Sequence, residues 1–544
     1  MRSKNLDIMF IALTGLLLLA RLFIECSLKT FGALGAVKIG NLLISVAAFV
    51  LVSMYFLKKT IFKEKIIVPK GWIVLALFGI ICTLSIFYSI DAPSSLSSAI
   101  YLWSCIFLIV MLVNLLDSIK RIKVIFLFFI AVGLIASVEA IGEYFFQLPW
   151  YLAHANPQML EGHRDVAQLV QTHRTPTLFM WPNTFCGFLI MVLPLAAALG
   201  LGTQKLSTKL RMGVLCVIFL YALFIELSIS CWLSLFLATL IFSFYLMQDM
   251  KVTQLKSWVM MTVSALGLIL TVVVIKKFNF SHMNSFSSRM QFLNHAYYLI
   301  KNHPFIGNGW DSFGTASAAY AKDINGWTNY AHNSYVQIFS ELGLYGIVNF
   351  TLFLVCLWKA ARLILTPKYH EHRWLILGLL IAISSCLIDN CFSYTMLKAS
   401  TAFYWWVLVA VLFSLKEFFE PLTGSLILSF RLKLVLVATV IFLSSFSYTL
   451  MAAEYDYFIA LPDIHSNINQ QEALRLFQEG GRLNPWDKKF ELAQAVVYEE
   501  MFYQTRDKSF LNKAHEMALM TMGQASLGAE RQAVLDRVDA NEKS

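Results

Sequence analysis

The stretch from Arg289 to Gly346 decides the fold. It contains RMQFLNHAYYLIK at 289–301, HPFIGNGWDSF at 303–313 and, after a polar loop, HNSYVQIFSELGLYG at 332–346. Apolar residues recur at helical spacing in the first segment, which therefore predicts an amphipathic helix. The proline and glycines of the second segment predict a tight turn that ends this helix. The third segment predicts the start of a second helix, which continues into a long apolar run.

The second predicted helix begins with a histidine and contains two glycines. Gly343 and Gly346 follow His332 by 11 and 14 positions. A rotation of about 100° per residue returns both glycines to roughly the face that His332 occupies. The pattern predicts a titratable imidazole above a helix-packing motif of small residues, along which another helix approaches closely.

The composition is that of a membrane protein. The chain has 544 residues, of which 58% are hydrophobic and 14% charged, and its mean hydropathy is +0.66. Soluble domains carry about a quarter charged residues, so the composition predicts a polytopic membrane protein instead. The net charge of +10 lies mainly in short loops between apolar runs. It therefore indicates membrane topology rather than binding to nucleic acid.

Apolar runs long enough to cross a bilayer organise the chain. Thirteen are predicted, near residues 8–24, 36–57, 72–90, 98–116, 122–146, 184–203, 210–227, 229–247, 257–275, 336–361, 374–393, 399–415 and 432–451. Lys and Arg cluster in alternate loops, so the positive-inside rule places the N-terminus in the cytoplasm. Thirteen spans then place both long loops and the C-terminal segment outside.

The fold class predicted from these runs is all-α. It is a polytopic transmembrane helical bundle of about 12–13 spans with a small extracytoplasmic helical tail. Residues 473–487 of the tail resemble the second helix and exit turn of a tetratricopeptide repeat, and the plainer interpretation is a small helical cap. The predicted segments are transmembrane helices at 1–146, an outer loop at 147–183, transmembrane helices at 184–275, a large outer loop at 276–335 with the motif that begins at His332, transmembrane helices at 336–451 and the extracytoplasmic domain at 454–544.

The stretch around His332 resembles the O-antigen ligase and polymerase family of bacterial membrane glycosyltransferases. That family carries His, then Asn, Ser or Gln, then nine residues, Gly, two residues, and Gly, Thr or Tyr. His332, Asn333, Gly343 and Gly346 fit this pattern position for position. The preceding arginine helix and the glycine-containing turn also look like the family, and the resemblance covers roughly residues 150–415.

The first outer loop carries a second part of the resemblance. The family places an Arg, a Gly, an aromatic residue and a Pro-Asn pair here. Arg174, Phe179 and the pair Pro182-Asn183 match, whereas Thr177 stands where Gly is common. Pro followed by Asn is also typical of a helix start.

One feature common in the family is absent. The family often has Ser-Arg-Gly at the start of a later span, and the corresponding stretch here, 227–232, reads LSISCW without the Arg. If that Arg contributes to activity in the family, this chain must do without it or replace it with another group near Cys231.

The chemistry explains why arginine and histidine belong together. A polyprenyl diphosphate is a multiply charged leaving group, so the site needs fixed positive charge, which the planar fork of arginine supplies. A sugar hydroxyl is a poor nucleophile when neutral, and histidine is the natural base for its proton. We therefore predict His332 as the catalytic residue. The predicted substrate-binding residues are Arg174, Arg289, Asn333 and Asn183.

Plainer interpretations remain for these residues. The arginines are also typical of interfacial residues that hold lipid headgroups, and His332 of a helix-start residue. The outer acidic residues form no Asp-x-Asp pair, and the outer histidines lack a metal-ligand pattern. We therefore expect no metal and no cofactor.

The resemblance implies an enzyme that takes a glycan from an undecaprenyl diphosphate carrier in lipopolysaccharide biosynthesis. An O-antigen ligase with lipid A core as acceptor is the leading hypothesis. The sequence leaves open a repeat-unit polymerase and a protein oligosaccharyltransferase. A transporter or flippase, or a membrane scaffold, would be other classes. The expected partners are the lipid-linked donor, a glycan or glycolipid acceptor, membrane lipids and proteins that bind the tail. The expected location is the bacterial inner membrane, with the C-terminal domain in the periplasm.

Overall fold

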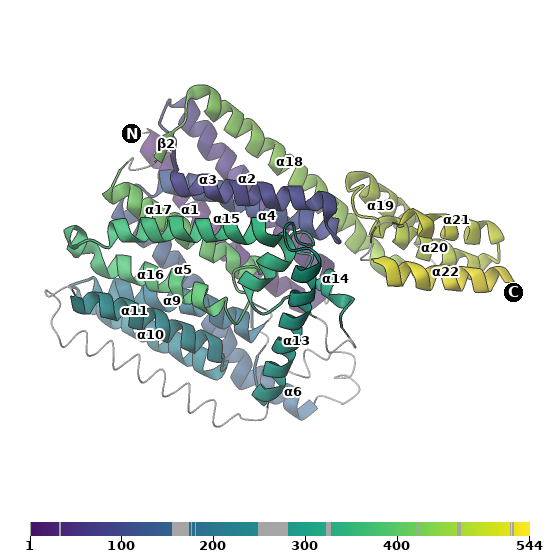
Figure 1. Cartoon of the computed structure of the whole chain (residues 1–544), viewed down its shortest axis with the longest axis horizontal. Helices are drawn as coiled ribbons and strands as arrows, with labels where there is room; N and C mark the ends of the chain where they lie inside the picture. Colours follow the sequence, from purple (N-terminus) through teal and green to yellow (C-terminus); the bar gives the residue numbers. More distant parts are fainter. Residues whose placement is uncertain are drawn as a thin grey trace.

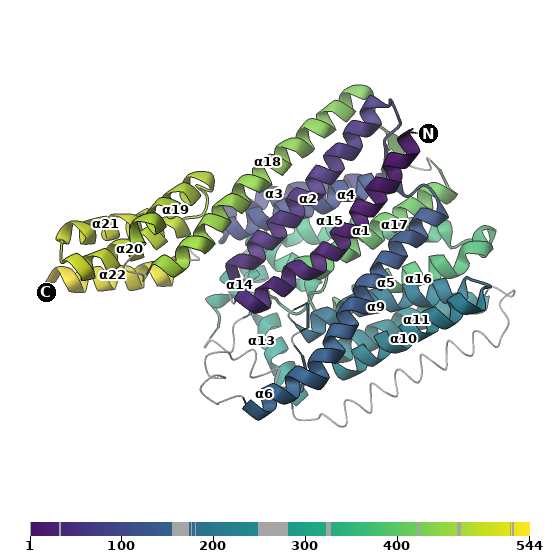
Figure 2. The ribbon, with the colours of Figure 1, turned by 180° about the vertical axis from the view of Figure 1, so that it is seen from behind.

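The computed structural model describes residues 2–31, 34–154, 173–175, 177–179, 181–248, 281–321, 328–421, 425–464, 469–522, 524 and 527–543. Within these ranges the chain is almost entirely helical, and eleven segments are long and apolar enough to cross a membrane. The predicted polytopic all-α fold is therefore confirmed. Figures 1 and 2 show the bundle from opposite sides.

The membrane-length segments are built on one set of helices. These are α1 (Arg2–Phe31), α2 (Leu34–Ile61), α3 (Lys70–Ser85), α4 (Ala92–Leu115), α5 (Ile119–Gly142), α9 (Pro182–Leu201), α10 (Leu206–Ile225), α15 (Ser334–Ile364), α16 (Arg373–Asp389), α17 (Ala399–Phe419) and α18 (Phe430–Ala460). The other helices are α6 (Leu148–His154), α11 (Ile229–Gln248), α13 (Ser281–Asn302), α14 (Phe313–Ala318), α19 (Gln470–Leu483), α20 (Lys489–Thr505), α21 (Lys508–Met520) and α22 (Gly528–Lys543).

Eleven of the predicted apolar runs coincide with these membrane-length segments. The run at 229–247 is the separate helix α11, whose described apolar part, Ile229–Ser243, is shorter. The run at 257–275 lies outside the described residues. Three residues, 226–228, separate α10 from α11, so this closely spaced pair is two helices and not one.

Basic loops from distant parts of the chain meet at one end of the bundle. Lys58 pairs with Asp7 at 3.0 Å and with Glu64 at 3.1 Å, and Arg121 pairs with Asp7 at 3.2 Å. Lys433 donates to the backbone carbonyl of Glu64 at 2.6 Å. A short antiparallel pair, β1 (Ile67–Pro69) with β2 (Ser425–Ile427), closes the same end. The basic clusters near residues 58–70, 121 and 431–433, which the charge pattern assigned to one side, therefore share one side.

Helix α13, which carries Arg289, lies across the bundle rather than along it. Figure 1 shows it roughly perpendicular to α10, α11, α15 and α16. It is not among the candidate spans. Phe292, Ala296 and Leu299 are buried on one side of it, whereas Gln291 and Asn294 are exposed on the other. Its amphipathic sequence therefore covers one end of the bundle.

The C-terminal tail continues directly from the last membrane-length helix. α18 runs without a break beyond the predicted apolar run, and its last turns pack against α19 and α20 through Ala453, Phe477 and Phe490. Lys489 pairs with the buried Glu454 at 2.5 Å, which fixes α20 to α18. Helices α19–α22 lie beyond the end of the bundle at which α14 lies (Figures 1 and 2).

Candidate active site

A break in α15 organises the site. Gly343 has φ 62° and ψ −159°, which is not helical, so the helix is interrupted between its first turns and its long apolar part. A Cβ at Gly343 would lie 2.2 Å from the backbone carbon of Phe305 and 2.5 Å from the nitrogen of Ile306. The prediction of an uninterrupted helix with a small-residue stripe for a neighbouring helix is therefore corrected. The element that approaches Gly343 is the turn after α13.

That turn takes over the hydrogen bonds that the break releases. A break leaves backbone donors and acceptors without helical partners, and these need partners when buried. Four backbone-to-backbone hydrogen bonds join the turn to α15: Asn308 N–H to Ser340 O at 3.2 Å, Gly309 N–H to Glu341 O at 2.8 Å, Leu344 N–H to Pro304 O at 2.8 Å and Tyr345 N–H to Phe305 O at 3.3 Å. Gly307 and Gly309 also have positive φ, because their backbones lie against α15 and Ser89, respectively.

A buried carboxylate connects this turn to the histidine. Glu341 accepts the backbone N–H groups of Asp311 at 2.9 Å and Phe313 at 3.2 Å. It also accepts the side-chain amide of Gln337 at 2.9 Å. The amide oxygen of Gln337 accepts the N–H of Ala331, the residue before the histidine, at 3.0 Å. This chain of hydrogen bonds connects the turn to the residue before His332, at the start of α15.

His332 is held between aromatic rings. Its ring lies 5.5 Å from that of Phe292, nearly parallel, and 4.9 Å from that of Tyr394, edge to face. Tyr330 stacks on Tyr394 at 4.2 Å. The backbone of His332 has φ 54°, an uncommon conformation for a residue with a side chain. The imidazole is thus half-buried and restricted in orientation.

Burial, together with the charge of Arg289, keeps the imidazole neutral. Burial lowers the pKa of His332 to about 3, and the nearby Arg289 guanidinium contributes to the decrease. Burial also lowers the pKa of Arg289, while Asp389 and Tyr394 act in the opposite direction. Arg289 therefore lies within electrostatic reach of His332, Asp389 and Tyr394.

Arg174 reaches the same region from the segment that precedes α9. One terminal nitrogen donates to Oδ1 of Asn183 at 2.7 Å. Its Nε is buried and makes no hydrogen bond within the part of the chain that the structure describes. Its positive charge acts on Arg289. The two predicted arginines are therefore brought together, and Asn183 orients one of them.

Buried ionisable groups hold the segment that carries Arg174. Glu139 belongs to α5, Glu143 begins the π-helix η2 (Glu143–Gln147), and Glu226 follows α10. The backbone contacts are Thr175 N–H to Glu226 at 3.3 Å, Thr177 N–H to Glu143 at 2.9 Å, Leu178 N–H to Glu139 at 3.1 Å and Lys398 Nζ to Phe179 O at 3.1 Å. The hydroxyl of Thr175 also donates to Glu226. These acidic residues were missed from the sequence, where each stands alone beside an apolar run.

The backbone conformation of Thr177 and the hydrogen bonds of Asn333 give structural reasons for the residues found at these two positions of the family pattern. Thr177 has φ 48°, a conformation that glycine adopts without steric cost, which explains why Gly is common at this position. Asn333 caps α15, because its Oδ1 accepts the N–H groups of Tyr335 and Val336, both at 3.1 Å. Its amide nitrogen donates to Cys391 O at 3.0 Å. The structure gives Asn333 a helix-capping role that the prediction of substrate binding did not include.

Asp389 lies beside Cys231, in the stretch 227–232 that lacks the Arg often found in the family. Its carboxylate is fully buried, accepts the Thr395 hydroxyl at 2.7 Å and faces the Cys231 thiol at 3.5 Å. Arg289 is a cation whose charge acts on Asp389. Among the described residues, no group of three or more His, Cys, Asp or Glu side chains is arranged to hold a metal ion.

The comparison with protein families identifies this region. Residues 214–351 match the model of the O-antigen ligase family. The match contains Arg289, His332, Gly343 and Gly346, whereas Arg174 precedes it. No curated protein matches the chain. The resemblance seen in the sequence is confirmed over residues 214–351, which the O-antigen ligase family model matches, and the chain is a polytopic membrane protein.

Proposed function

We propose that this protein transfers a glycan from undecaprenyl diphosphate to a hydroxyl of the lipid A core, as an O-antigen ligase. One observation supports it above the others. The imidazole of His332, neutral because its pKa is low, is fixed by Phe292 and Tyr394 within electrostatic reach of Arg289, and Arg289 in turn lies within reach of Arg174. His332 and Arg289 both lie in the region that the family model matches. This combination provides a base and an anion site in one place.

The proposed reaction divides the work between these residues. The acceptor oxygen bonds to the anomeric carbon, and the bond from that carbon to the diphosphate oxygen breaks with its electron pair. The hydroxyl proton passes to a ring nitrogen of His332. Arg174 and Arg289 stabilise the charge of the departing diphosphate. Neither a metal nor a cofactor takes part in this scheme.

The charges also make the base responsive to the donor. Arg289 adds to the decrease of the His332 pKa that burial causes. A bound diphosphate offsets that positive charge, so the pKa of His332 rises, although burial still holds it below its ordinary value. His332 therefore becomes a stronger base when the donor is in place.

The proposed orientation places the site on the periplasmic side of the inner membrane. The basic loops at the opposite end of the bundle then face the cytoplasm with the N-terminus, in accord with the positive-inside rule. The tail would lie in the periplasm, where its tetratricopeptide-like helices would bind proteins. With Asn294→Cys, an impermeant thiol reagent added from the periplasmic side should label α13. Labelling only from the cytoplasmic side would contradict this orientation.

A reconstituted assay tests the proposed function. Purified protein in lipid nanodiscs receives labelled undecaprenyl diphosphate glycan with lipid A core, with a second lipid-linked repeat unit, or with an acceptor peptide. Ligase activity predicts label on lipid A core, with and without a chelator, and none with His332→Ala. Transfer only to the second repeat unit would identify a polymerase, and transfer only to the peptide an oligosaccharyltransferase. If no acceptor is labelled but proteoliposomes translocate the donor, the protein is a flippase.

A further inference from the structure

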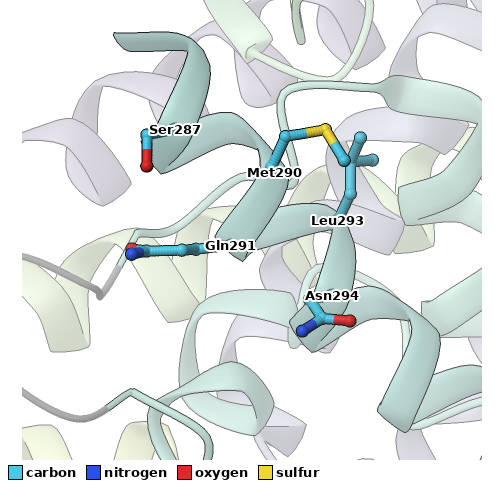
Figure 3. A pocket seen from close by; sticks show the side chains of 5 residues that line it. All are labelled: Ser287, Met290, Gln291, Leu293 and Asn294. Atoms are coloured by element: carbon cyan, nitrogen blue, oxygen red, sulfur yellow. The ribbon is translucent and has the colours of Figure 1, made fainter. Parts of the chain in front are cut away.

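We propose that the outward side of α13 binds the saccharide chain of the donor, beyond the sugar attached to the diphosphate. This inference rests on the proposed function, because it names a second contact for the same substrate. A shallow hollow on α13 is lined by Ser287, Met290, Gln291, Leu293 and Asn294. Figure 3 shows these side chains projecting from successive turns of the helix.

The polar residues of this surface follow the helix repeat. Ser287, Gln291, Asn294, Tyr298 and Asn302 are separated by four, three, four and four positions, so they form one continuous stripe. Ser287, Gln291, Asn294 and Asn302 are exposed, and 43% of the Tyr298 side chain is exposed. The stripe carries hydroxyl and amide groups and no ionised side chain.

An aromatic pair continues the surface. Tyr298 stacks on Tyr320 at 5.5 Å with an angle of 14° between the rings. Asn302 donates to the hydroxyl of Tyr320 at 2.7 Å. Because Tyr320 follows α14, this contact fixes the stripe to a second element. The rings and amides are therefore presented in a defined arrangement.

The chemistry of this surface fits a saccharide. Amide side chains both donate and accept, as sugar hydroxyls do. Tyrosine supplies an apolar ring surface together with a hydroxyl, and the C–H faces of a sugar ring suit such surfaces. A phosphate or a headgroup anion would instead select arginine or lysine. Met290 and Leu293 at the edge of the hollow add apolar contact.

The position on α13 favours the donor over the acceptor. Arg289, proposed to hold the diphosphate, lies on the same helix, on the side opposite the polar stripe. The two sides of a helix are about 10–12 Å apart, which a chain of a few sugars spans. The glycan is covalently joined to the diphosphate, so it must start close to α13. The acceptor needs to bring only its hydroxyl to His332 on the other helix.

A kinetic comparison tests the inference with a matched control. Gln291→Ala combined with Asn294→Ala should raise KM for a multi-sugar donor about 5- to 100-fold, with little change in kcat, because two uncharged hydrogen bonds are lost. For a donor with one sugar on the diphosphate, the double variant should equal the wild type. Tyr297→Ala, an exposed tyrosine outside the stripe, should change neither value. An equal loss with both donors would overturn the inference.

A cross-linking experiment tests it without transfer. Asn294 or, as the control, Tyr297 is replaced by p-benzoylphenylalanine in full-length His332→Ala protein. We expect position 294 to cross-link to radiolabelled donor glycan, and excess carrier-free glycan to suppress the product. Cross-links from position 294 only to lipid A core or only to phospholipid would overturn the inference, as would no cross-link. Transfer by His332→Ala would overturn the proposed base instead, so the two failures are distinguishable.

Discussion

The ring of Phe292 lies 5.5 Å from the ring of His332, at an angle of 20°. Phe292 follows Arg289 by three positions, so one turn of α13 supplies both the aromatic support of the imidazole and the cation that lowers its pKa. The crosswise position of α13 is what joins these two functions. Substitutions can therefore distinguish the proposed base from the arginines that bind the anion and from the residues that support the backbone.

His332→Ala should lower kcat by about 10²–10⁴-fold while the protein still inserts and accumulates, because a general base contributes about that factor. Labelled product formed per unit of purified protein measures the effect. His303→Ala is the matched control, since His303 is exposed in the turn after α13. Activity of His332→Ala within about threefold of wild type would exclude the role of base.

The pH dependence should differ between the free enzyme and its donor complex. The pKa of His332 is about 3 in the empty site, so the imidazole is already neutral at pH 5. kcat/KM, which reports the free enzyme, should show no loss from His332 between pH 8 and pH 5. The bound diphosphate raises the pKa of His332, so the acid limb of kcat should lie at a higher pH than the acid limb of kcat/KM. An acid limb in kcat/KM near the ordinary histidine pKa of about 6.5 would refute this account.

The sequence predicted eleven of the membrane-length segments, the helix that carries Arg289 and the turn after it, because each depends on local periodicity or on a spaced motif. It did not predict the break at Gly343, since the glycine spacing fits a packing stripe equally well. The break depends on long-range bonds from Pro304 and Phe305 to α15. Glu143 and Glu226 were missed for a similar reason. Their partners, Thr177 and Thr175, come from a different loop.

Gly343→Ala should therefore lower the stability of the protein far more than it would if Gly343 were only part of a helix-packing stripe. Its φ of 62° disfavours a side chain, and the new Cβ would collide with the backbone of Phe305 at 2.2 Å. Strain of this kind costs about 1–3 kcal/mol before the clash is added. Protein yield and thermal unfolding measure the loss. Gly213→Ala is the control, because a Cβ at Gly213 would meet nothing within 4 Å. Equal yields and melting temperatures for both variants would contradict the role assigned to Gly343.

Glu226 should act on donor binding through Thr175. Glu226→Ala leaves the buried Thr175 N–H without its acceptor, a change that costs about 1–3 kcal/mol. Because Arg174 precedes Thr175, we expect KM for the donor to rise about tenfold or more, with a smaller change in kcat. Glu226→Gln retains a carbonyl acceptor and should restore most of the affinity.

Glu516→Ala, at an exposed acidic residue of the tail, provides the control for this pair. It should leave KM for the donor unchanged. If Glu226→Ala lowered protein yield alone and kept the wild-type KM, Glu226 would be a residue of the scaffold without influence on Arg174.

Arg174 and Arg289 should hold the diphosphate together. Arg174 lies in the segment before α9 and Arg289 on α13, yet the charge of Arg174 acts on Arg289. Arg174 also retains a buried Nε with no hydrogen bond among the described residues. Each Arg→Ala change removes a charge-assisted contact worth about 1.5–3 kcal/mol, so turnover at low donor concentration should fall about ten- to hundredfold. Each Arg→Lys change should also impair transfer, although less, because lysine keeps the charge but not the planar fork. Donor binding and single-turnover rates, measured for both single variants and the double variant, separate affinity from chemistry. Arg211→Ala, at an exposed residue of α10, should behave as wild type. Normal binding and transfer in both Arg→Ala variants would mean that these arginines only anchor lipid headgroups, and the diphosphate would then have to bind elsewhere.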